Sequence, residues 1–173
     1  MTPRVVLVGP MGAGKSTVAG LLAARWGARV RDTDEDIEAA EGRTISEIFV
    51  DDGEQRFRSL ERAAVAEALS QHDGVLALGG GAVLDPGTRD LLAAHRVVFL
   101  NVGLADAVKR VGLGVGRPLL LGNVRARVKA LLDERLPLYQ TVAGVQVDTD
   151  GRTPEDVAAD VAEAVEKQEA EGR

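Results

Sequence analysis

The segment Gly9–Ser16, GPMGAGKS, constrains the fold of this chain more than any other stretch. It matches G-x-x-x-x-G-K-[ST], follows the apolar run Arg4–Val8, and precedes apolar residues at helical spacing. The glycines let successive backbone N–H groups turn toward phosphate oxygens, and the helix that follows, from about Lys15 to Trp26, presents its positive end to them. The segment therefore predicts a phosphate-binding loop (P-loop) and a nucleoside triphosphate site.

Each fixed residue of this loop has a chemical task. Lys15 is expected to reach the outer phosphates, and the Ser16 hydroxyl is expected to ligate Mg²⁺. The predicted ATP-binding residues of the segment are Gly12, Ala13, Gly14, Lys15, Ser16 and Thr17. The chain has no Asn-Lys-x-Asp guanine-reading motif, and its length is typical of a small-molecule kinase. A non-catalytic nucleotide-dependent switch is the alternative from another class.

Along the rest of the chain, strand-length apolar runs alternate with segments of helical period. Strands are predicted at Arg4–Val8, Ala28–Arg31, Val75–Leu78, Arg96–Leu100 and Ala143–Val147. Helices are predicted at 15–26, from Thr44, at 53–71, 86–94, 104–111 and 126–135, and from Thr153-Pro154. This alternation predicts an α/β fold in one domain spanning 1–173, with a central five-stranded parallel sheet flanked by helices. A mobile lid is predicted at about 112–124, and the charged tail at about 166–173 is expected to fray.

Composition narrows the class of protein further. A chain of 173 residues with 45% apolar and 28% charged residues is ordinary for a globular protein. It has no cysteine, so disulfides and thiolate metal sites are excluded, and its net charge of −6 argues against general nucleic-acid binding. We expect a cytoplasmic monomer without a signal peptide and without a membrane partner. His72 and His95 have no partner at ligand spacing, and surface positions are expected for both.

Two acidic residues and two arginines are candidates for a second site. Asp32 and Asp34 flank Thr33 at the predicted end of a strand, so both carboxylates could face the ligand crevice, one holding Mg²⁺ and one accepting from a hydroxyl. The alternative is that Thr33 or Asp34 caps the following helix. Arg58 and Arg135 each have a structural explanation, in a solvated helix-surface ion pair and at a helix C-terminus. Together they could converge on a carboxylate, the planar anion that guanidinium groups match best.

Three consecutive glycines, Gly79–Gly81, end the apolar run Val75–Leu78. A plain turn after a strand would need one glycine rather than three. Glycine is used where backbone must approach a ligand closely, so this run is a candidate for substrate contact.

In combination, these motifs resemble the shikimate kinase family, in the same order and over nearly the whole chain. The resemblance is carried by the P-loop, Asp-Thr-Asp at 32–34, GEQRFRSLE around Arg58, LGGGAV at 78–83, GRPL at 116–119 and RLPLY at 135–139. The P-loop alone is shared by a large superfamily, whereas the combination is specific.

The resemblance implies phosphorylation of shikimate by MgATP to shikimate 3-phosphate, in aromatic amino acid (chorismate) biosynthesis. It implies that Arg58 and Arg135 bind the substrate carboxylate, that Asp34 binds ring hydroxyls, and that the backbone of Gly79, Gly80 and Gly81 contacts the ring. Lys15, Asp34 and Arg117 are the implied catalytic residues, with Arg117 arriving as the lid closes. Ser16 and Asp32 are implied to hold Mg²⁺, and Arg110, Arg117 and Arg152 to join the ATP-binding residues.

Two points stay open at this level. Asp34 could act as a base or only orient the hydroxyl. A kinase for another small acceptor, such as a sugar acid or a nucleoside monophosphate, is the nearest rival.

Overall fold

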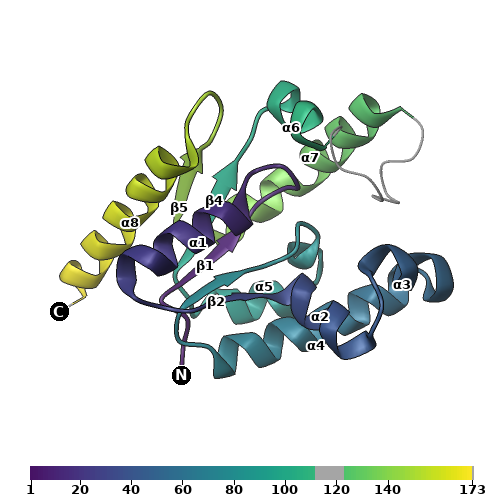
Figure 1. The fold of residues 1–173 in the computed structure, drawn as a ribbon, viewed down its shortest axis with the longest axis horizontal. Helices are drawn as coiled ribbons and strands as arrows, with labels where there is room; N and C mark the ends of the chain where they lie inside the picture. Colours follow the sequence, from purple (N-terminus) through teal and green to yellow (C-terminus); the bar gives the residue numbers. More distant parts are fainter. Residues whose placement is uncertain (112–122, 173) are drawn as a thin grey trace.

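The computed structural model describes residues 1–111 and 123–172, and its centre is a parallel β-sheet with helices on both faces (Figure 1). The strands are β1 (Val5–Val8), β2 (Val30–Asp32), β3 (Val75–Ala77), β4 (Val97–Asn101) and β5 (Val145–Asp148), in the order β2-β3-β1-β4-β5. The helices are α1 (Lys15–Trp26), α2 (Thr33–Glu41), α3 (Ile45–Asp52), α4 (Glu54–Gln71), the 3₁₀ turn η1 (Ala82–Leu84), α5 (Pro86–Leu92), α6 (Leu104–Val111), α7 (Val124–Val142) and α8 (Pro154–Glu171). The α/β fold with five parallel strands confirms the prediction.

The central strand β1 organises the core. Its four residues are at most 1% exposed, as a parallel strand covered on both faces requires. Successive side chains point to opposite faces, so Val5 and Leu7 pack with α1 and α8, and Val6 and Val8 pack with α4, α5 and α7. In Figure 1, α1 and α8 lie side by side on one face of the sheet.

A smaller cluster joins the helices that follow β2. Ile37 of α2, Ile48 of α3 and Phe57 of α4 are buried together. Helices α2 and α3 pack against α4, at the end of the molecule away from α8 (Figure 1). No helix in residues 1–111 and 123–172 is both long and apolar enough to cross a bilayer.

Several element boundaries follow from local chemistry that the sequence displays. The Thr44 hydroxyl accepts a hydrogen bond from the Glu47 N–H and caps α3, and Thr153 caps α8 in the same way ahead of Pro154. Helix α1 begins at Lys15, so the last two residues of the P-loop segment form its first turn. These three starts agree with the predictions.

The second strand and its carboxylates differ from the prediction. Asp32 ends β2 and caps α2, because its carboxylate accepts from the N–H groups of Asp34 and Glu35. Asp34 therefore lies in the first turn of a helix and not in an extended segment. The expectation that the two carboxylates project from alternate positions of one strand is wrong, and so is the alternative that Thr33 or Asp34 is the cap.

The predicted end of the helix at 126–135 is also wrong. Helix α7 continues through Pro137 to Val142, so Arg135 lies inside the helix and not at its end. A proline within a helix removes one backbone hydrogen bond but leaves the φ of a helical residue, so packing can carry a helix past it. At the chain end, α8 includes residues 166–171, and Glu166 and Glu169 from the tail expected to fray make ion pairs with Arg25 and Arg4.

Candidate functional site

Three adjacent strands deliver the predicted site residues to one edge of the sheet. The P-loop follows β1, Asp32 ends β2, and the glycine run follows β3; these strands are neighbours in the order β2-β3-β1. Because all three run parallel, their carboxyl ends meet at the same edge, where ligands of open α/β sheets bind.

The backbone of the P-loop makes close contacts with β4, Lys15 and Arg110. Gly9 has φ +149, and a Cβ there would collide with the Leu100 carbonyl oxygen of β4. The Lys15 ammonium donates to the carbonyl oxygens of Gly9 and Pro10, at 2.6 and 3.0 Å. Arg110, from α6, donates to the Gly12 carbonyl at 2.6 Å and so lies against the loop. The structure thus brings Arg110 to the predicted nucleotide site.

Two oxygen atoms beside the P-loop fit a hard divalent cation. The Ser16 hydroxyl lies 3.4 Å from Oδ2 of Asp32. The other oxygen of Asp32 is occupied by the α2 N–H groups at 2.8 and 3.3 Å. Mg²⁺ is commonly held by one or two protein oxygens together with phosphate oxygens and water, which matches this donor set.

The three glycines after β3 lie directly against four charged side chains. A Cβ on Gly79 would stand 2.6 Å from Oδ1 of Asp34 and 3.0 Å from Oε2 of Glu61. A Cβ on Gly81 would lie 2.5 Å from Nη2 of Arg58. These side chains occupy the space that a larger residue would need, so the glycines permit their close approach.

The middle glycine links this pocket to the P-loop. From a Cβ on Gly80, Nη1 of Arg135 and the Met11 backbone nitrogen would both be 3.5 Å away. Arg135, predicted from sequence, is only 4% exposed although it comes from a distant helix. The structure therefore gathers Arg135 and Gly80 beside the loop expected to bind phosphate.

Glu61 is a buried member of the pocket that the sequence analysis did not single out. It is 4% exposed, and its Oε1 accepts from Nη1 of Arg58 at 2.8 Å. Glu54 accepts from Nη2 of the same arginine at 3.4 Å. The sequence analysis expected a solvated ion pair around Arg58. Pairs form at both spacings, with Glu54 at i−4 and Glu61 at i+3, and the one with Glu54 is exposed. The expectation is wrong for Glu61, because that residue is buried.

Three side-chain atoms of these charged residues have no hydrogen-bond partner within the described residues. They are Oδ1 of Asp34, Nε of Arg58 and Nε of Arg135, all of them buried. Unsatisfied buried polar atoms are costly and rare in folded proteins. A ligand that offers acceptors to the guanidinium groups and a hydroxyl to the carboxylate would satisfy them.

Asp34 has an unusual protonation equilibrium. Burial, with the negative charges of Glu61 and Asp32, raises the pKa of Asp34 from 3.8 to about 7, although Lys15 and Arg58 act in the opposite direction. Burial also raises the pKa of Glu61, against the pull of Arg58. A carboxyl that titrates near neutral pH beside a phosphate site can exchange a proton with a bound hydroxyl.

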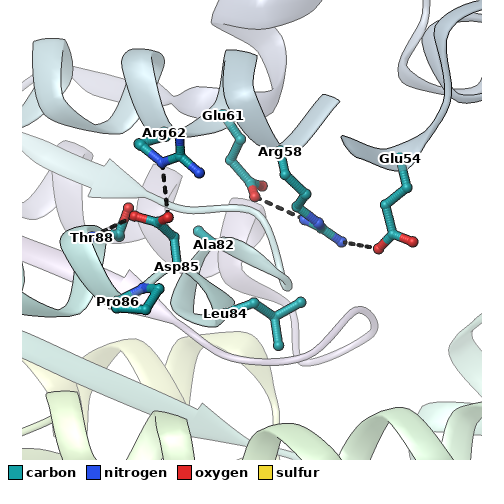
Figure 2. Close-up of a pocket in the computed structure, with 9 residues that line it drawn as sticks. All are labelled: Glu54, Arg58, Glu61, Arg62, Ala82, Leu84, Asp85, Pro86 and Thr88. Carbon is teal, nitrogen blue, oxygen red and sulfur yellow. Dashed lines mark hydrogen bonds and ion pairs between the residues drawn. The ribbon is translucent and has the colours of Figure 1, made fainter. Parts of the chain in front are cut away.

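A cavity of about 220 Å³ lies between α4 and the η1–α5 segment (Figure 2). Its lining residues are Glu54, Arg58, Glu61, Arg62, Ala82, Leu84, Asp85, Pro86 and Thr88. Arg62 and Asp85 form a 2.8 Å ion pair across it, and two of its lining residues, Arg58 and Glu61, also lie against the glycine run.

The remaining candidates are not brought together in the same way. Arg152 pairs with Asp160 at 2.7 Å and donates to the carbonyls of Asp148 and Asp156, so its described contacts all lie around the start of α8. Arg117 and the predicted lid up to residue 122 lie outside the described residues. The last two lid positions, 123 and 124, are the cap and first residue of α7.

A parallel sheet with a P-loop at its carboxyl edge and a charged, glycine-lined pocket beside it defines a P-loop small-molecule kinase. A family model described as shikimate kinase matches residues 11–166. Shikimate kinases of Streptomyces avermitilis and Thermobifida fusca are 59% and 60% identical to this chain, over 97% and 90% of it and 98% and 91% of their own lengths. The solved structure of a shikimate kinase from Acinetobacter baumannii in complex with shikimate has a TM-score of 0.92 and 35% identity, covering 97% of this chain and 94% of that one. The chain belongs to the shikimate kinase family.

Proposed function

We propose that this chain transfers the γ-phosphoryl group of ATP to a hydroxyl of shikimate, giving shikimate 3-phosphate and ADP for aromatic amino acid biosynthesis. Its membership of the family supports this activity. The observation that carries it is the pocket in which two arginines and one carboxylate meet three glycines beside the P-loop. Shikimate is a ring with one carboxylate and three hydroxyls. The carboxylate can accept from the two arginines, and a hydroxyl can donate to Asp34.

The acceptor is bound by groups of opposite character. Arg58 and Arg135 bind the carboxylate of shikimate, and their unpartnered Nε atoms are the donors it would satisfy. Asp34 binds the ring hydroxyls through its unpartnered Oδ1. The backbone of Gly79–Gly81 contacts the ring, beside the charged side chains that the missing Cβ atoms admit.

ATP is bound by the P-loop and by arginines around it. Residues 12–17 cradle the phosphates, and the Lys15 ammonium exchanges its bonds to the Gly9 and Pro10 carbonyls for phosphate oxygens. Arg110, already in contact with the loop, and Arg152, near the start of α8, complete the nucleotide side. Arg117 adds positive charge at the transferred group.

Ser16 and Asp32, whose nearest side-chain oxygens lie 3.4 Å apart, would hold Mg²⁺. When bound, Mg²⁺ neutralises charge that develops on the phosphate oxygens.

Phosphoryl transfer depends mainly on positioning and on stabilising charge, because its transition state is loose. Asp34 aligns the attacking hydroxyl and, when ionised, accepts its proton. With a pKa near 7, Asp34 is both ionised in a large fraction of molecules and basic enough to take part. Lys15 stabilises the charge on the transferring phosphoryl group.

The test is release of ADP by the purified chain with MgATP, alone and with shikimate, gluconate or a nucleoside monophosphate. We expect stimulation by shikimate alone. Stimulation by another acceptor would keep the P-loop chemistry and overturn the acceptor, and ATP binding without stimulation would favour a nucleotide-dependent switch.

Two arginine variants sharpen this test. Arg58→Ala should raise KM for shikimate by roughly 100-fold, as expected for loss of a charge-assisted pair, and leave MgATP binding nearly intact. Arg56→Ala removes an exposed arginine of the same helix and is the matched control, with both constants unchanged. Loss of ATP binding in Arg58→Ala with shikimate affinity kept would contradict the role given to Arg58.

A further inference from the structure

Tyr139 makes the hydrogen bond that holds the middle of the glycine run. Its side chain is 1% exposed, and its hydroxyl donates to the Gly80 carbonyl oxygen at 2.5 Å. Its ring stacks on Phe99 of β4, with centroids 4.9 Å apart and an interplanar angle of 26°. The core therefore fixes the position of the Tyr139 ring, and the ring places its hydroxyl at Gly80.

The bond fixes the orientation of a whole peptide unit. The peptide between Gly80 and Gly81 is trans, so its C=O and N–H point in opposite directions. With the carbonyl directed at α7, the Gly81 N–H is directed away from that helix. Within the described residues, the Gly81 N–H donates to no backbone carbonyl. No acceptor in the described part of the chain takes this donor, so it is available to a ligand.

The surroundings of the two glycines place this donor at the acceptor pocket. Gly81 abuts the Arg58 guanidinium, and Gly80 abuts Nη1 of Arg135. Tyr139 and Arg135 are four residues apart on α7, so they lie on the same face of that helix. One helix therefore supplies both a pocket arginine and the group that orients the peptide next to it.

We propose that Tyr139 is a positioning residue for the acceptor, which holds the Gly80 carbonyl so that the Gly81 N–H faces bound shikimate. The inference deepens the proposed function and rests on it. Glycines have no side chain to lock their own conformation, so an external hydrogen bond is needed to keep the peptide in one orientation. Burial raises the pKa of Tyr139 to about 12, which keeps the hydroxyl a donor throughout the range in which the enzyme works.

The test is Tyr139→Phe, which removes the hydroxyl and keeps the ring and its stacking. We expect KM for shikimate to rise about tenfold, because about one hydrogen bond to the substrate is lost. KM for ATP should change by less than about twofold. In a spectrum of the chain labelled with ¹⁵N-glycine, the Gly81 amide should shift, because a bond to the preceding carbonyl polarises that amide. A merely structural role would lower the thermal midpoint and leave KM for shikimate at its wild-type value, whereas the amide shift reports only that the bond to the Gly80 carbonyl is lost.

Phe99→Leu is the matched control, because it disturbs the stacked ring without removing the hydroxyl. It should lower the thermal midpoint and raise KM for shikimate less than Tyr139→Phe does, because the hydroxyl is kept. An equal rise of this KM in both variants, or no rise in Tyr139→Phe beside an active wild type, would overturn the inference. A wild-type protein that shikimate does not stimulate would remove the proposed function itself, and the inference with it, so the two failures are distinct.

Discussion

Asp34 and Glu61 show how much of this site depends on single buried carboxyls. Both lie against Gly79, and burial raises the pKa of each. Glu61 is neutralised by its 2.8 Å pair with Arg58, whereas Oδ1 of Asp34 has no partner among residues 1–111 and 123–172. Asp34 is thus the residue at which stability is given up for chemistry.

This trade predicts that Asp34→Asn is more stable than the wild type at high pH. The folded-state pKa of about 7 lies above the usual 3.8, so the wild-type carboxyl contributes full stability below 3.8 and loses it as the pH rises through about 7. The stability gap between variant and wild type should widen by on the order of 2 kcal/mol between pH 5 and pH 8.

Urea unfolding at the two pH values measures this gap. Asp90→Asn, at an exposed position on α5, is the control and should show a constant difference. The same Asp34→Asn protein should be inactive with shikimate. A gap that narrows as the pH rises would contradict the direction of the shift.

Residue types were better indicated by the sequence than residue environments. Asp34, Arg58 and Arg135 were candidates because carboxylate and guanidinium groups suit a hydroxy acid, and the structure places all three at one pocket. His72 was expected at the surface, yet it is 5% exposed, with Nε2 3.2 Å from the Arg29 carbonyl oxygen and 3.1 Å from that of Val75. A lone histidine carries no local signal of burial, because its environment is set by segments distant in the sequence.

At the scale of elements, β3 is followed by glycines, and side chains from other elements occupy the space where their Cβ atoms would be. The substitution Gly79→Ala would place a methyl group 2.6 Å from Asp34 and 3.0 Å from Glu61. Such overpacking costs about 1–3 kcal/mol, so we expect shikimate affinity to fall roughly 10- to 100-fold while ATP affinity is kept. Titration of each substrate by isothermal calorimetry would measure both affinities.

Gly20→Ala is the matched control for this substitution. Gly20 is exposed within α1, and a Cβ there would meet no atom within 4 Å. Alanine should stabilise the helix by about 0.5–1 kcal/mol and leave both affinities unchanged. Unchanged shikimate affinity in Gly79→Ala would show that the glycine is not needed for space.

Elements were predicted well where one local signal dominated. The bounds of α1 and α6 agree with the prediction, because a P-loop fixes the first start and an apolar stripe marks both helices. The end of α7 was misplaced because Pro137 is a strong local stop signal that tertiary packing overrides. The predicted β2 began two residues early and ended one residue early, since a three-residue edge strand has almost no pattern of its own.

At the scale of the whole molecule, α8 ties the end of the chain to its beginning. Glu169 pairs with Arg4 at 2.9 Å, and the Arg4 guanidinium lies 4.1 Å from the centroid of the Trp26 ring. Glu166 accepts from the Trp26 indole N–H and pairs with Arg25. None of these residues lies near the carboxyl edge of the sheet, so this network serves stability.

We therefore expect Glu169→Gln to lower the free energy of unfolding by about 1 kcal/mol at low salt, and by less at high salt. The kinetic constants should not change. Glu163→Gln, on an exposed face of the same helix, is the control and should be neutral. Urea unfolding at two ionic strengths measures the difference, and a loss of activity in Glu169→Gln would contradict the separation of this network from the site.

Sheet order is the part of the fold that the sequence did not reveal. Alternating strands and helices predicted parallel pairing, but the order β2-β3-β1-β4-β5 depends on contacts between segments tens of residues apart. The closeness of Tyr139 to Gly80 is of the same kind, because it depends on how α7 packs back against a segment 59 positions earlier in the chain.

The central place of β1 has a consequence for synthesis of the chain. The P-loop is encoded within the first 16 residues, but β1 pairs with β3 and β4 and gains its second neighbour only after Asn101 has left the ribosome. For most of translation the residues of the nucleotide site have been made but the sheet that positions them has not yet formed. ATP in the cell is thus a ligand for the completed sheet alone, and by mass action it favours nascent chains that have finished folding over those still in progress.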